Sequence, residues 1–283
     1  MGTLYLVATP IGNRLDVSQR AVETLRGVQL IAAEDTRHTG RLLEHLGIET
    51  PMLSYHALNE RSRRERLLSA LSGGDVALVS DAGTPGISDP GHDLVDAALT
   101  AGYRVSPIPG PSSVIAAVAA SGLVPGPFYF QGFLPRKGVE RRRALARAAA
   151  SGAPVVLFEA ANRLVTTLSD LRESFGPRQA AVARELTKLH EEVRRGSLED
   201  LAVHYDAVPP RGEIVVVVGA GEEEETDPGD AESLVRSLLA ADLSPSEVAR
   251  EAAAVSGIPR SEAYHLVRQI KDERPPSEDG SDA

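Results

Sequence analysis

Short apolar runs bounded by glycine or proline alternate with helical patterns along the first 220 residues. Apolar runs of this length predict buried strands, and regular alternation of strand and helix is typical of an α/β fold with parallel strands. The second helix is predicted to end at Gly47, because glycine tolerates the left-handed backbone at a helix C-cap. The expected strands of the first half are residues 3–8, 29–33, 52–55, 76–80 and 104–107.

The expected helices of this half lie between those strands. The first is predicted to begin at Asp16, because Asp16 and Gln19 have the spacing of a capping box. The others are expected at residues 39–46, 59–71, 90–101 and 114–120. The same pattern continues with strands at 128–132, 155–159, 180–184 and 213–218, helices at 139–150 and 163–175, and one arm of a hairpin at 191–196.

The composition changes after residue 221. Residues 222–230 are acidic and contain Pro-Gly, which predicts a solvated linker. Ser244, Pro245 and Glu247 form a strong helix start, and two helices joined by a short turn resemble a helix-turn-helix. We therefore predict α/β domains at 1–112 and 113–221, a linker at 222–230, a helical extension at 231–274 and a disordered tail at 275–283.

Composition and charge narrow the function classes. The chain has 283 residues, 42% of them hydrophobic, and no cysteine, which excludes a disulfide scaffold, cysteine-ligated zinc and thiol catalysis. Apolar runs fall short of the roughly 18 residues that a membrane span needs, and the first eight residues fit a strand better than a signal peptide, so we expect a cytoplasmic protein without membrane association.

The net charge of −10 argues at first against a nucleic-acid partner. However, residues 222–283 hold sixteen acidic and six basic side chains, so the preceding 221 residues are neutral overall. Basic residues gather there at 61–66 and at 136–147. Most such runs are solvated helix faces, but Arg136, Lys137, Arg141, Arg142 and Arg143 are also candidates to dock on the phosphates of a polyanion.

The candidate chemistry lies in loops that follow predicted strands, where α/β sheets bind ligands. Residues 80–91 (SDAGTPGISDPG) combine glycines, which permit close backbone approach, with two carboxylates that accept hydrogen bonds. Residues 109–113 (PGPSS) present hydroxyl groups at a helix start, although ordinary capping also explains them. Glu34 and Asp35 are acid–base candidates, or else cap the next helix or pair with Arg37.

Several common sites are absent from the sequence. The first loop, residues 9–13, is not a GxGxxG dinucleotide loop, and there is no GxxxxGK[ST] phosphate loop. The seven histidines have no metal-binding spacing such as HExxH, so no metal is expected. A nucleophile elbow is also missing, which disfavours covalent hydrolase chemistry. The residues alone thus predict a two-domain α/β protein with a glycine-rich cleft, and leave the reaction open.

Six motifs in order carry a resemblance to a known family. They are LVATPIGN (6–13), AAEDTR (32–37), residues 80–91, PGPS (109–112), GFLPRK (132–137) and ARELTK (183–188). Together they resemble the tetrapyrrole methylase superfamily, and within it the branch that methylates small-subunit ribosomal RNA. The resemblance implies a class III S-adenosylmethionine (SAM) methyltransferase fold with a helical extension, and a homodimer. It also implies 2′-O-methylation of a cytidine in the decoding region of 16S rRNA in the small ribosomal subunit.

Site residues follow from the same resemblance. The implied acid–base or polar candidates around the acceptor are Glu34, Asp35, Arg37, Glu185 and Lys188. The implied SAM contacts are Pro10, Asp81, Gly83, Thr84, Ser112, Ser113, Phe158, Arg184 and Gly212.

Three alternatives stay open at this point. An enzyme of the same fold could methylate a tetrapyrrole or a diphthamide precursor, although residues 80–91 and 183–188 favour rRNA. A non-catalytic ribosome-binding protein could retain the fold, but the intact ligand loop disfavours it. DNA binding through the C-terminal helices is disfavoured by the acidity of that segment.

Overall fold

The computed structural model describes residues 2–221, 228–240, 244–256 and 258–272. The chain divides into two compact units, residues 1–221 and residues 222–283. Each unit is described by itself below. Residues 1–221 contain two five-stranded sheets, whose strands come from residues 3–108 and 129–218 respectively. The predicted boundary between two α/β domains near residue 112 stays a prediction, because both sheets belong to one compact unit.

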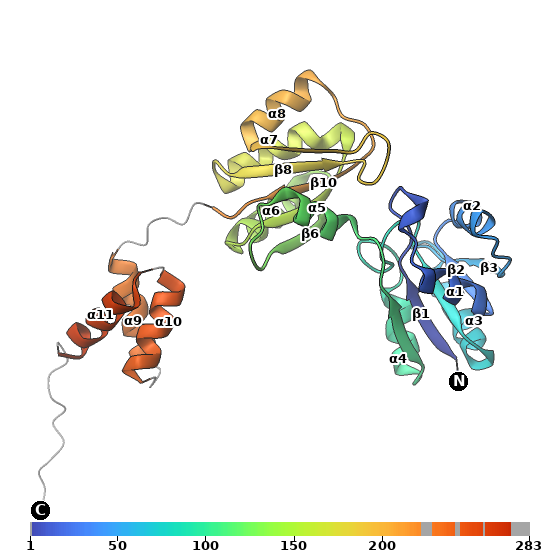
Figure 1. Ribbon diagram of the computed structural model, residues 1–283, viewed down its shortest axis with the longest axis horizontal. Helices are drawn as coiled ribbons and strands as arrows, with labels where there is room; N and C mark the ends of the chain where they lie inside the picture. The colour runs from blue at the N-terminus through green and yellow to red at the C-terminus, as the bar shows by residue number, and fades with distance from the viewer. Residues whose placement is uncertain (1, 222–227, 241–243, 257, 273–283) are drawn as a thin grey trace, which may run out of the picture. The chain divides into compact units, whose positions relative to one another are not determined.

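The first sheet, coloured blue to green in Figure 1, is parallel throughout and has the strand order β3-β2-β4-β1-β5. All four residues of β4 are buried, which explains why its sequence is an uninterrupted apolar run rather than an alternating one. The strands are β1 (Thr3–Val7), β2 (Leu30–Ala33), β3 (Met52–Ser54), β4 (Val76–Val79) and β5 (Arg104–Ile108).

Helices cover both faces of this sheet. Leu25 of α1 (Gln19–Gly27) and Leu43 of α2 (Thr36–Leu46) pack on one face, and Leu67 of α3 (Glu60–Gly73) and Leu94 of α4 (His92–Thr100) pack on the other. The helices that follow the neighbouring strands β1 and β4 therefore leave toward opposite faces. The loops after these two strands diverge, and such a divergence is where open α/β sheets bind ligands.

The second sheet is mixed and has the order β6-β7-β10-β8-β9. Only β6 and β7 run parallel, and β8 and β9 form the predicted hairpin, with Gln179 opposite Ser197. The strands are β6 (Tyr129–Phe133), β7 (Val155–Ala160), β8 (Gln179–Arg184), β9 (Glu192–Ser197) and β10 (Glu213–Val218).

The central strand β10 shows how the second sheet builds its two cores. Val216 faces the core made with α6 (Gly138–Ala150), α7 (Leu164–Phe175) and α8 (Leu198–Ala207), whereas its neighbour Val215 faces α5 (Ser113–Ser121). Successive side chains of a strand point to opposite faces, so a strand with five consecutive buried apolar residues needs cover on both. Ile11, from the loop after β1, and Leu186 belong to the α5 core. Apolar packing thus joins the two halves of the unit.

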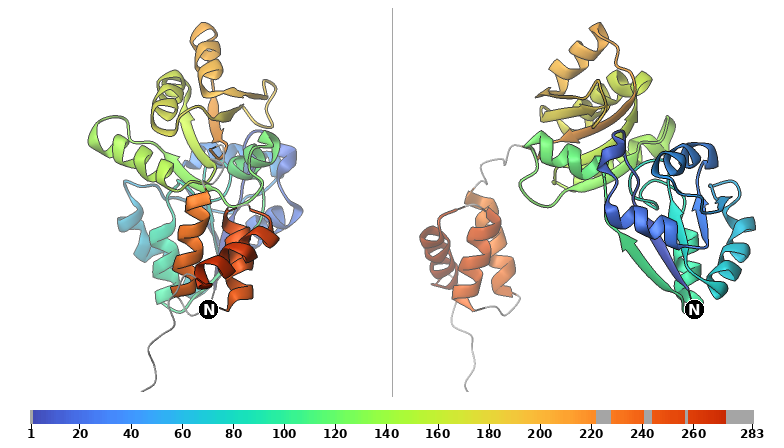
Figure 2. Two further views of the ribbon diagram at one scale, coloured as in Figure 1. Left: turned by 90° about the vertical axis from the view of Figure 1, so that its left-hand side faces the viewer. Right: turned by 45° about the vertical axis from the view of Figure 1, so that its right-hand side comes forward.

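The described residues of the C-terminal unit form three helices, α9 (Pro228–Ala240), α10 (Pro245–Ser256) and α11 (Arg260–Asp272) (Figures 1 and 2). Val235, Val248, Ala249 and Val267 are among the residues that form its own small core. As predicted, Ser244 and Glu247 make a reciprocal capping box at the start of α10. Most of the predicted linker, residues 222–227, and the predicted tail lie outside the described residues, whereas residues 228–230 begin α9.

Two expectations about elements were wrong. The first helix begins at Gln19 with Ser18 as its N-cap, and Asp16 instead belongs to a short 3₁₀ turn capped by Asn13. Helix α8 was also not expected, although Ser197 caps it and Gly196 precedes that cap. The remaining elements of residues 1–221 lie within a few residues of their expected positions. No helix in the described part of the chain is long and apolar enough to cross a membrane.

Candidate functional site

The two diverging loops of the first sheet are held together at their bases. The N–H of Thr9 donates to the carbonyl oxygen of Gly83 at 2.9 Å, and the N–H of Gly83 donates to that of Thr9 at 3.0 Å. Gly83 has a φ of +77°, which glycine adopts without strain. The glycines of residues 80–91 thus shape a loop that begins beside β1 and passes over the carboxyl edge of the sheet.

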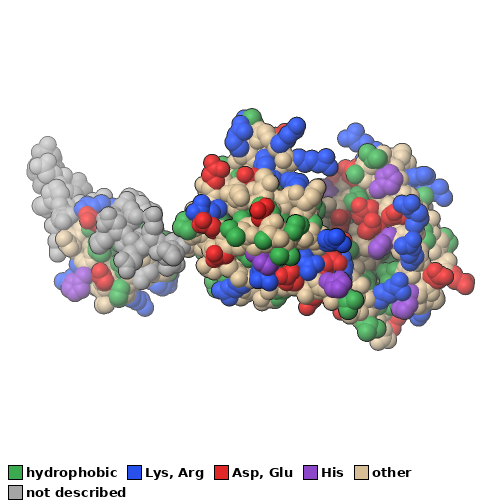
Figure 3. All heavy atoms as spheres, turned by 90° about the horizontal axis from the view of Figure 1, so that it is seen from above, with side chains coloured by type: hydrophobic (Ala, Val, Ile, Leu, Met, Phe, Trp, Pro, Cys, Tyr) green, Lys and Arg blue, Asp and Glu red, His purple; other side chains and the backbone are tan. Residues whose placement is uncertain are grey.

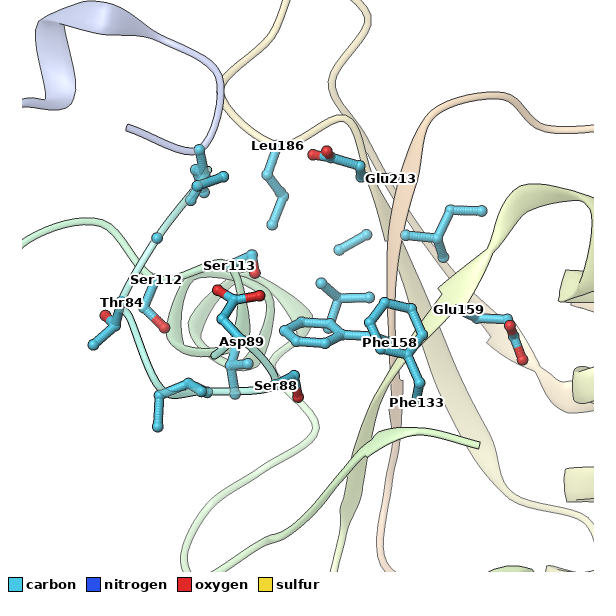
Figure 4. Close-up of a pocket in the computed structure, with 18 of the residues that line it drawn as sticks. Thr84, Ser88, Asp89, Ser112, Ser113, Phe133, Phe158, Glu159, Leu186 and Glu213 are labelled. Atoms are coloured by element: carbon cyan, nitrogen blue, oxygen red, sulfur yellow. The ribbon is translucent and has the colours of Figure 1, made fainter. Parts of the chain in front are cut away.

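A cavity of about 360 Å³ opens at this edge and takes its lining from both sheets. Thr84, Ser112 and Ser113 bring hydroxyl groups from the first half. Phe133 and Phe158, whose ring centroids lie 5.3 Å apart, bring an aromatic wall from the second half (Figure 4). An aromatic surface facing a few hydroxyl groups suits a ligand that has a flat apolar portion and a polar portion.

Six of the nine predicted SAM contacts line this cavity: Gly83, Thr84, Ser112, Ser113, Phe158 and Gly212. Pro10, Asp81 and Arg184 do not line it, although each adjoins a residue that does. Ser112 also caps α5 by accepting from the N–H of Ile115 at 3.4 Å, so the capping explanation holds beside the binding one. The carboxylate of Asp81 accepts from the N–H of Asp35 at 3.0 Å, and Asp81 thereby fixes the loop after β2.

A cluster of charges borders the cavity from the second sheet. The Nζ atom of Lys188 donates to Glu185 and to Glu213, both at 2.9 Å. Burial alone would lower the pKa of Lys188, but these hydrogen bonds outweigh it and raise the pKa. The hydrogen bond from Lys188 also lowers the pKa of Glu185. Lys188 therefore stays protonated and Glu185 ionised at neutral pH, and neither is suited to carry a proton.

The segment that bears Lys188 packs closely against the loop after β1. The hydroxyl of Thr187 accepts from the N–H of Asn13 at 2.9 Å, and a side chain at Gly12 would collide with Lys188 and Thr187. Glu185 and Thr187 have φ values of +50° and +67°, which are unusual for residues other than glycine. Strained backbone of this kind gathers where function requires a fixed geometry.

Three carboxylates interact at the carboxyl edge of the first sheet. Glu34 accepts from the N–H of Asp81 at 3.3 Å, and Asp89 lies close enough to both residues to interact with their charges. A space-filling view shows acidic side chains gathered in the hollow on this side (Figure 3). Burial raises the pKa of Glu34, and burial together with the neighbouring negative charges raises the pKa of Asp89 to about 6.

Of these three, Asp89 alone lines the cavity, and its carboxylate points into it beside Ser113 (Figure 4). Ser88, which precedes it, has a φ of +63°. Asp89 was not among the predicted site residues, because sequence shows a carboxylate in a loop but not its burial. The available signal was the second aspartate of the SDAGTPGISDPG segment.

Asp35 and Arg37 form a local pair at the start of α2. Asp35 accepts from the N–H of Arg37 at 2.8 Å as the cap of α2, and its carboxylate also binds the Arg37 guanidinium at 2.7 Å. These hydrogen bonds hold the pKa of Asp35 far below its usual range. Neither residue lines the cavity, so the structure favours the cap-and-pair interpretation over acid–base work.

Comparisons with known proteins show the family to which this chain belongs. The model of the family of tetrapyrrole (corrin/porphyrin) methylases matches residues 3–202. A ribosomal RNA small subunit methyltransferase I from Synechocystis is 46% identical over 276 residues, which cover 96% of this chain and 99% of that protein. One from Xylella fastidiosa is 47% identical, with coverage of 93% and 98%. The chain belongs to the ribosomal RNA small subunit methyltransferase I family of tetrapyrrole methylases.

Solved structures show the fold of this methyltransferase family. The methyltransferase CobJ is 21% identical with a TM-score of 0.60, and covers 78% of this chain and 95% of its own. The uroporphyrin-III C-methyltransferase of Thermus thermophilus, solved with S-adenosylhomocysteine, is 20% identical with a TM-score of 0.54, and the coverage is 77% and 97%. The predicted α/β fold class, that of the class III methyltransferases, is thereby confirmed.

In this member of the methyltransferase I family, the basic residues of segment 136–147 differ in burial. Arg136, Lys137, Arg142 and Arg143 are exposed. Arg141 is buried, and its guanidinium binds Asp170, Thr167 and the carbonyl oxygen of Pro135. A guanidinium that is enclosed in this way does not reach an external phosphate. We therefore withdraw Arg141 from the predicted RNA contacts and keep the other four.

Other lining residues were also missed. Glu213 contributes both a wall of the cavity and a partner of Lys188, and Leu186 and Phe133 contribute apolar wall. These residues meet the cavity through the packing of segments that are far apart in the sequence, which a local sequence pattern does not show. Among the described residues, no group of three or more histidine, aspartate or glutamate side chains is placed to hold a metal ion.

Proposed function

We propose that this protein transfers the methyl group of SAM to the 2′-hydroxyl of a cytidine in the decoding region of 16S rRNA within the small ribosomal subunit. The observation that carries the proposal is one cavity lined from both sheets in a chain that is 46% identical to a methyltransferase of small-subunit rRNA. The relatives that share only the fold, with identities of 16–23%, include tetrapyrrole and diphthine enzymes, so the rRNA assignment is favoured over those substrates.

The cavity fits SAM in size and in chemistry. Its volume of about 360 Å³ lies in the range of small-ligand sites. The phenyl rings of Phe133 and Phe158 offer a surface for the adenine, while Thr84, Ser112 and Ser113 offer hydroxyl groups to the polar portion. When bound, SAM supplies an activated methyl group on a sulfonium whose sulfur departs as a neutral thioether. SAM binding is expected by calorimetry at one site per chain, and absence of heat with folded protein would contradict this part.

The protein has two tasks in such a transfer. It holds the acceptor hydroxyl in line with the methyl group, and positioning of this kind is worth roughly 7–11 kcal/mol in well-oriented cases. It also takes the hydroxyl proton as the new carbon–oxygen bond forms and the carbon–sulfur bond breaks. We assign the proton to the carboxylate of Asp89, because it points into the cavity and its pKa is raised to about 6.

Exposed arginines are proposed to bind the rRNA backbone. Arg142→Glu and Arg143→Glu are each expected to weaken binding to the small subunit several-fold and to lower its salt dependence, because each removes a phosphate contact. Arg104→Glu is the control, since Arg104 is exposed at the amino end of β5, the opposite edge of that sheet from the cavity. Binding is measured by filter retention across a salt series. Equal effects of all three variants would show only a general charge effect and remove Arg142 and Arg143 from the interface.

Two further assignments accompany this function. The substrate places the activity in the cytoplasm, where ribosomal subunits assemble. The homodimer that the resemblance implies is tested by sedimentation equilibrium of the full chain, which should give twice the mass of 30.0 kDa.

A further inference from the structure

A buried network of charged and polar side chains lies behind the cavity wall. Glu159, at the end of β7, is fully buried, and its carboxylate accepts from the hydroxyl of Thr167 at 2.5 Å and pairs with the Nε of Arg163 at 3.4 Å. Thr167 in turn accepts from Arg141 at 2.8 Å, and Arg141 also binds Asp170 at 2.7 Å. We call these five residues the Glu159 network.

The two arginines of the network direct their remaining donors at one short stretch of backbone. Arg163 donates to the carbonyl oxygen of Leu134 at 3.0 Å, and Arg141 donates to that of Pro135 at 3.1 Å. These carbonyls immediately precede Arg136 and Lys137, both exposed. These two arginines therefore hold the base of the loop that carries two of the proposed phosphate contacts.

The same network adjoins the cavity. Glu159 lines it next to Phe158, while its carboxylate is turned away from the cavity toward the network (Figure 4). Phe133, one residue before Leu134, lines the cavity as well. Through Glu159 the network adjoins Phe158 along the chain. Through Arg163 and Arg141 it binds the carbonyl oxygens of Leu134 and Pro135, which lie between Phe133 and the basic loop.

A gain in folding stability does not explain why charged side chains form the Glu159 network. Burying the Glu159 carboxylate and the Arg141 guanidinium costs solvation free energy, and well-packed apolar residues usually hold two elements together at least as well. A guanidinium differs from an apolar side chain in fixing carbonyl oxygens at set directions through its planar fork. The network therefore favours a fixed loop geometry rather than added stability.

We propose that Glu159 and Arg163 are positioning residues that hold the basic loop of Arg136 and Lys137 at a fixed place relative to the cavity. Phosphates bound by the loop then bring the acceptor nucleotide into register with the methyl donor. This inference rests on the proposed rRNA function. It adds a structural connection between the loop that binds rRNA phosphates and the cavity wall that binds SAM.

The test compares Arg163→Met and Arg163→Lys with Arg172→Met. The exposed side chain of Arg172, on α7, pairs with Glu199 at the start of α8. Arg163→Met is expected to raise the KM for small subunits about tenfold while the calorimetric Kd for SAM changes less than about twofold. Arg163→Lys keeps the charge without the fork, so it should recover stability but not KM. Arg172→Met should change neither constant. An unchanged KM in folded Arg163→Lys protein would overturn the proposal.

A second measurement separates positioning from general weakening. The double substitution Arg136→Glu and Lys137→Glu is made both in the wild type and in Arg163→Lys. If Arg163 acts through the loop, the double substitution should raise KM by a smaller factor in Arg163→Lys than in the wild type. Fully additive effects would show that the loop keeps its place without Arg163 and would also overturn the proposal. Failure of the wild type to methylate small subunits would instead reject the proposed function itself.

Discussion

Asp89→Asn is expected to slow methyl transfer by about 10²-fold or more at neutral pH, which is the usual loss when a proton acceptor is removed. Asparagine keeps the shape of the side chain and its hydrogen bonds but does not take up the hydroxyl proton. The loss should fall on kcat, with the affinity for SAM changed little. Single-turnover methylation with saturating SAM and small subunits measures it.

The control for this variant is Asp93→Asn. Asp93 is half exposed and pairs with Arg64 on the surface, so its carboxylate is removed without touching the cavity. A rate for Asp89→Asn that matches that of Asp93→Asn would exclude Asp89 as the proton acceptor. Glu34, whose charge interacts with Asp89, would then be the next candidate.

The pH dependence of the rate follows from the same group. The Asp89 pKa is about 6, and only the ionised form accepts a proton, so the wild-type rate should rise through pH 6 and level off above it. Asp89→Asn should lose this limb of the profile, whereas Asp93→Asn should retain it. A profile in Asp89→Asn that keeps the limb at the same pH would assign it to another group.

Stability should move in the opposite direction to activity. The folded pKa of Asp89 lies above the ordinary value of 3.8, so the folded protein binds the proton more tightly than the unfolded chain. Stability contributed by the protonated form is therefore complete below pH 4 and is lost as the pH rises to about 6. The neutral side chain of Asp89→Asn does not lose stability in this pH range, so its melting temperature at pH 7 should equal or exceed that of the wild type. Residues retained for activity at a cost in stability typically behave in this way.

Gly212→Ala is expected to lower the affinity for SAM at least about tenfold and to destabilise the protein by roughly 1–3 kcal/mol. Gly212 has a φ of +87° and lines the cavity, and a Cβ atom there would collide with the carboxylate of Glu185. That carboxylate accepts from Lys188 and from the N–H of Glu213, so its displacement disturbs the whole charged cluster. Calorimetry with SAM and urea unfolding measure the two effects.

Gly102→Ala separates strain from collision in this experiment. Gly102 has a nearly equal φ of +79°, but a Cβ atom there meets no other atom within 4 Å. It should therefore show the backbone cost alone, with SAM affinity unchanged. Equal SAM affinity in both alanine variants would mean that the Glu185 cluster does not shape the cavity.

The sequence predicted the fold well where local pattern decides it. Strand β10 has the expected bounds because five consecutive buried positions need an unbroken apolar run, and α2 ends at Gly47 because the left-handed backbone there favours glycine. Where a competing local signal existed, prediction failed. The spacing of Asp16 and Gln19 imitated a capping box, while the neighbouring Ser18 is the cap that the helix uses.

The site was predictable only in part. Loops rich in glycine and proline after strands located the first-sheet side of the cavity, including Thr84 and Ser112. The roles of single charges depended on distant partners. Arg141 is buried against Asp170, which lies 29 residues later, and Lys188, in the turn after β8, pairs with Glu213 of β10. Burial of Asp89, which raises its pKa, likewise arises from packing that sequence alone does not display.

The most direct test of this account is methylation of small ribosomal subunits from a strain that lacks this gene. Purified protein is incubated with these subunits and SAM carrying a labelled methyl group, and the labelled nucleotide is mapped. We expect label on the 2′-oxygen of a cytidine in the decoding region of 16S rRNA, with far less label for Asp89→Asn at matched times. Protein that binds SAM tightly but leaves this cytidine unlabelled, or labels a base instead of a ribose, would contradict the account.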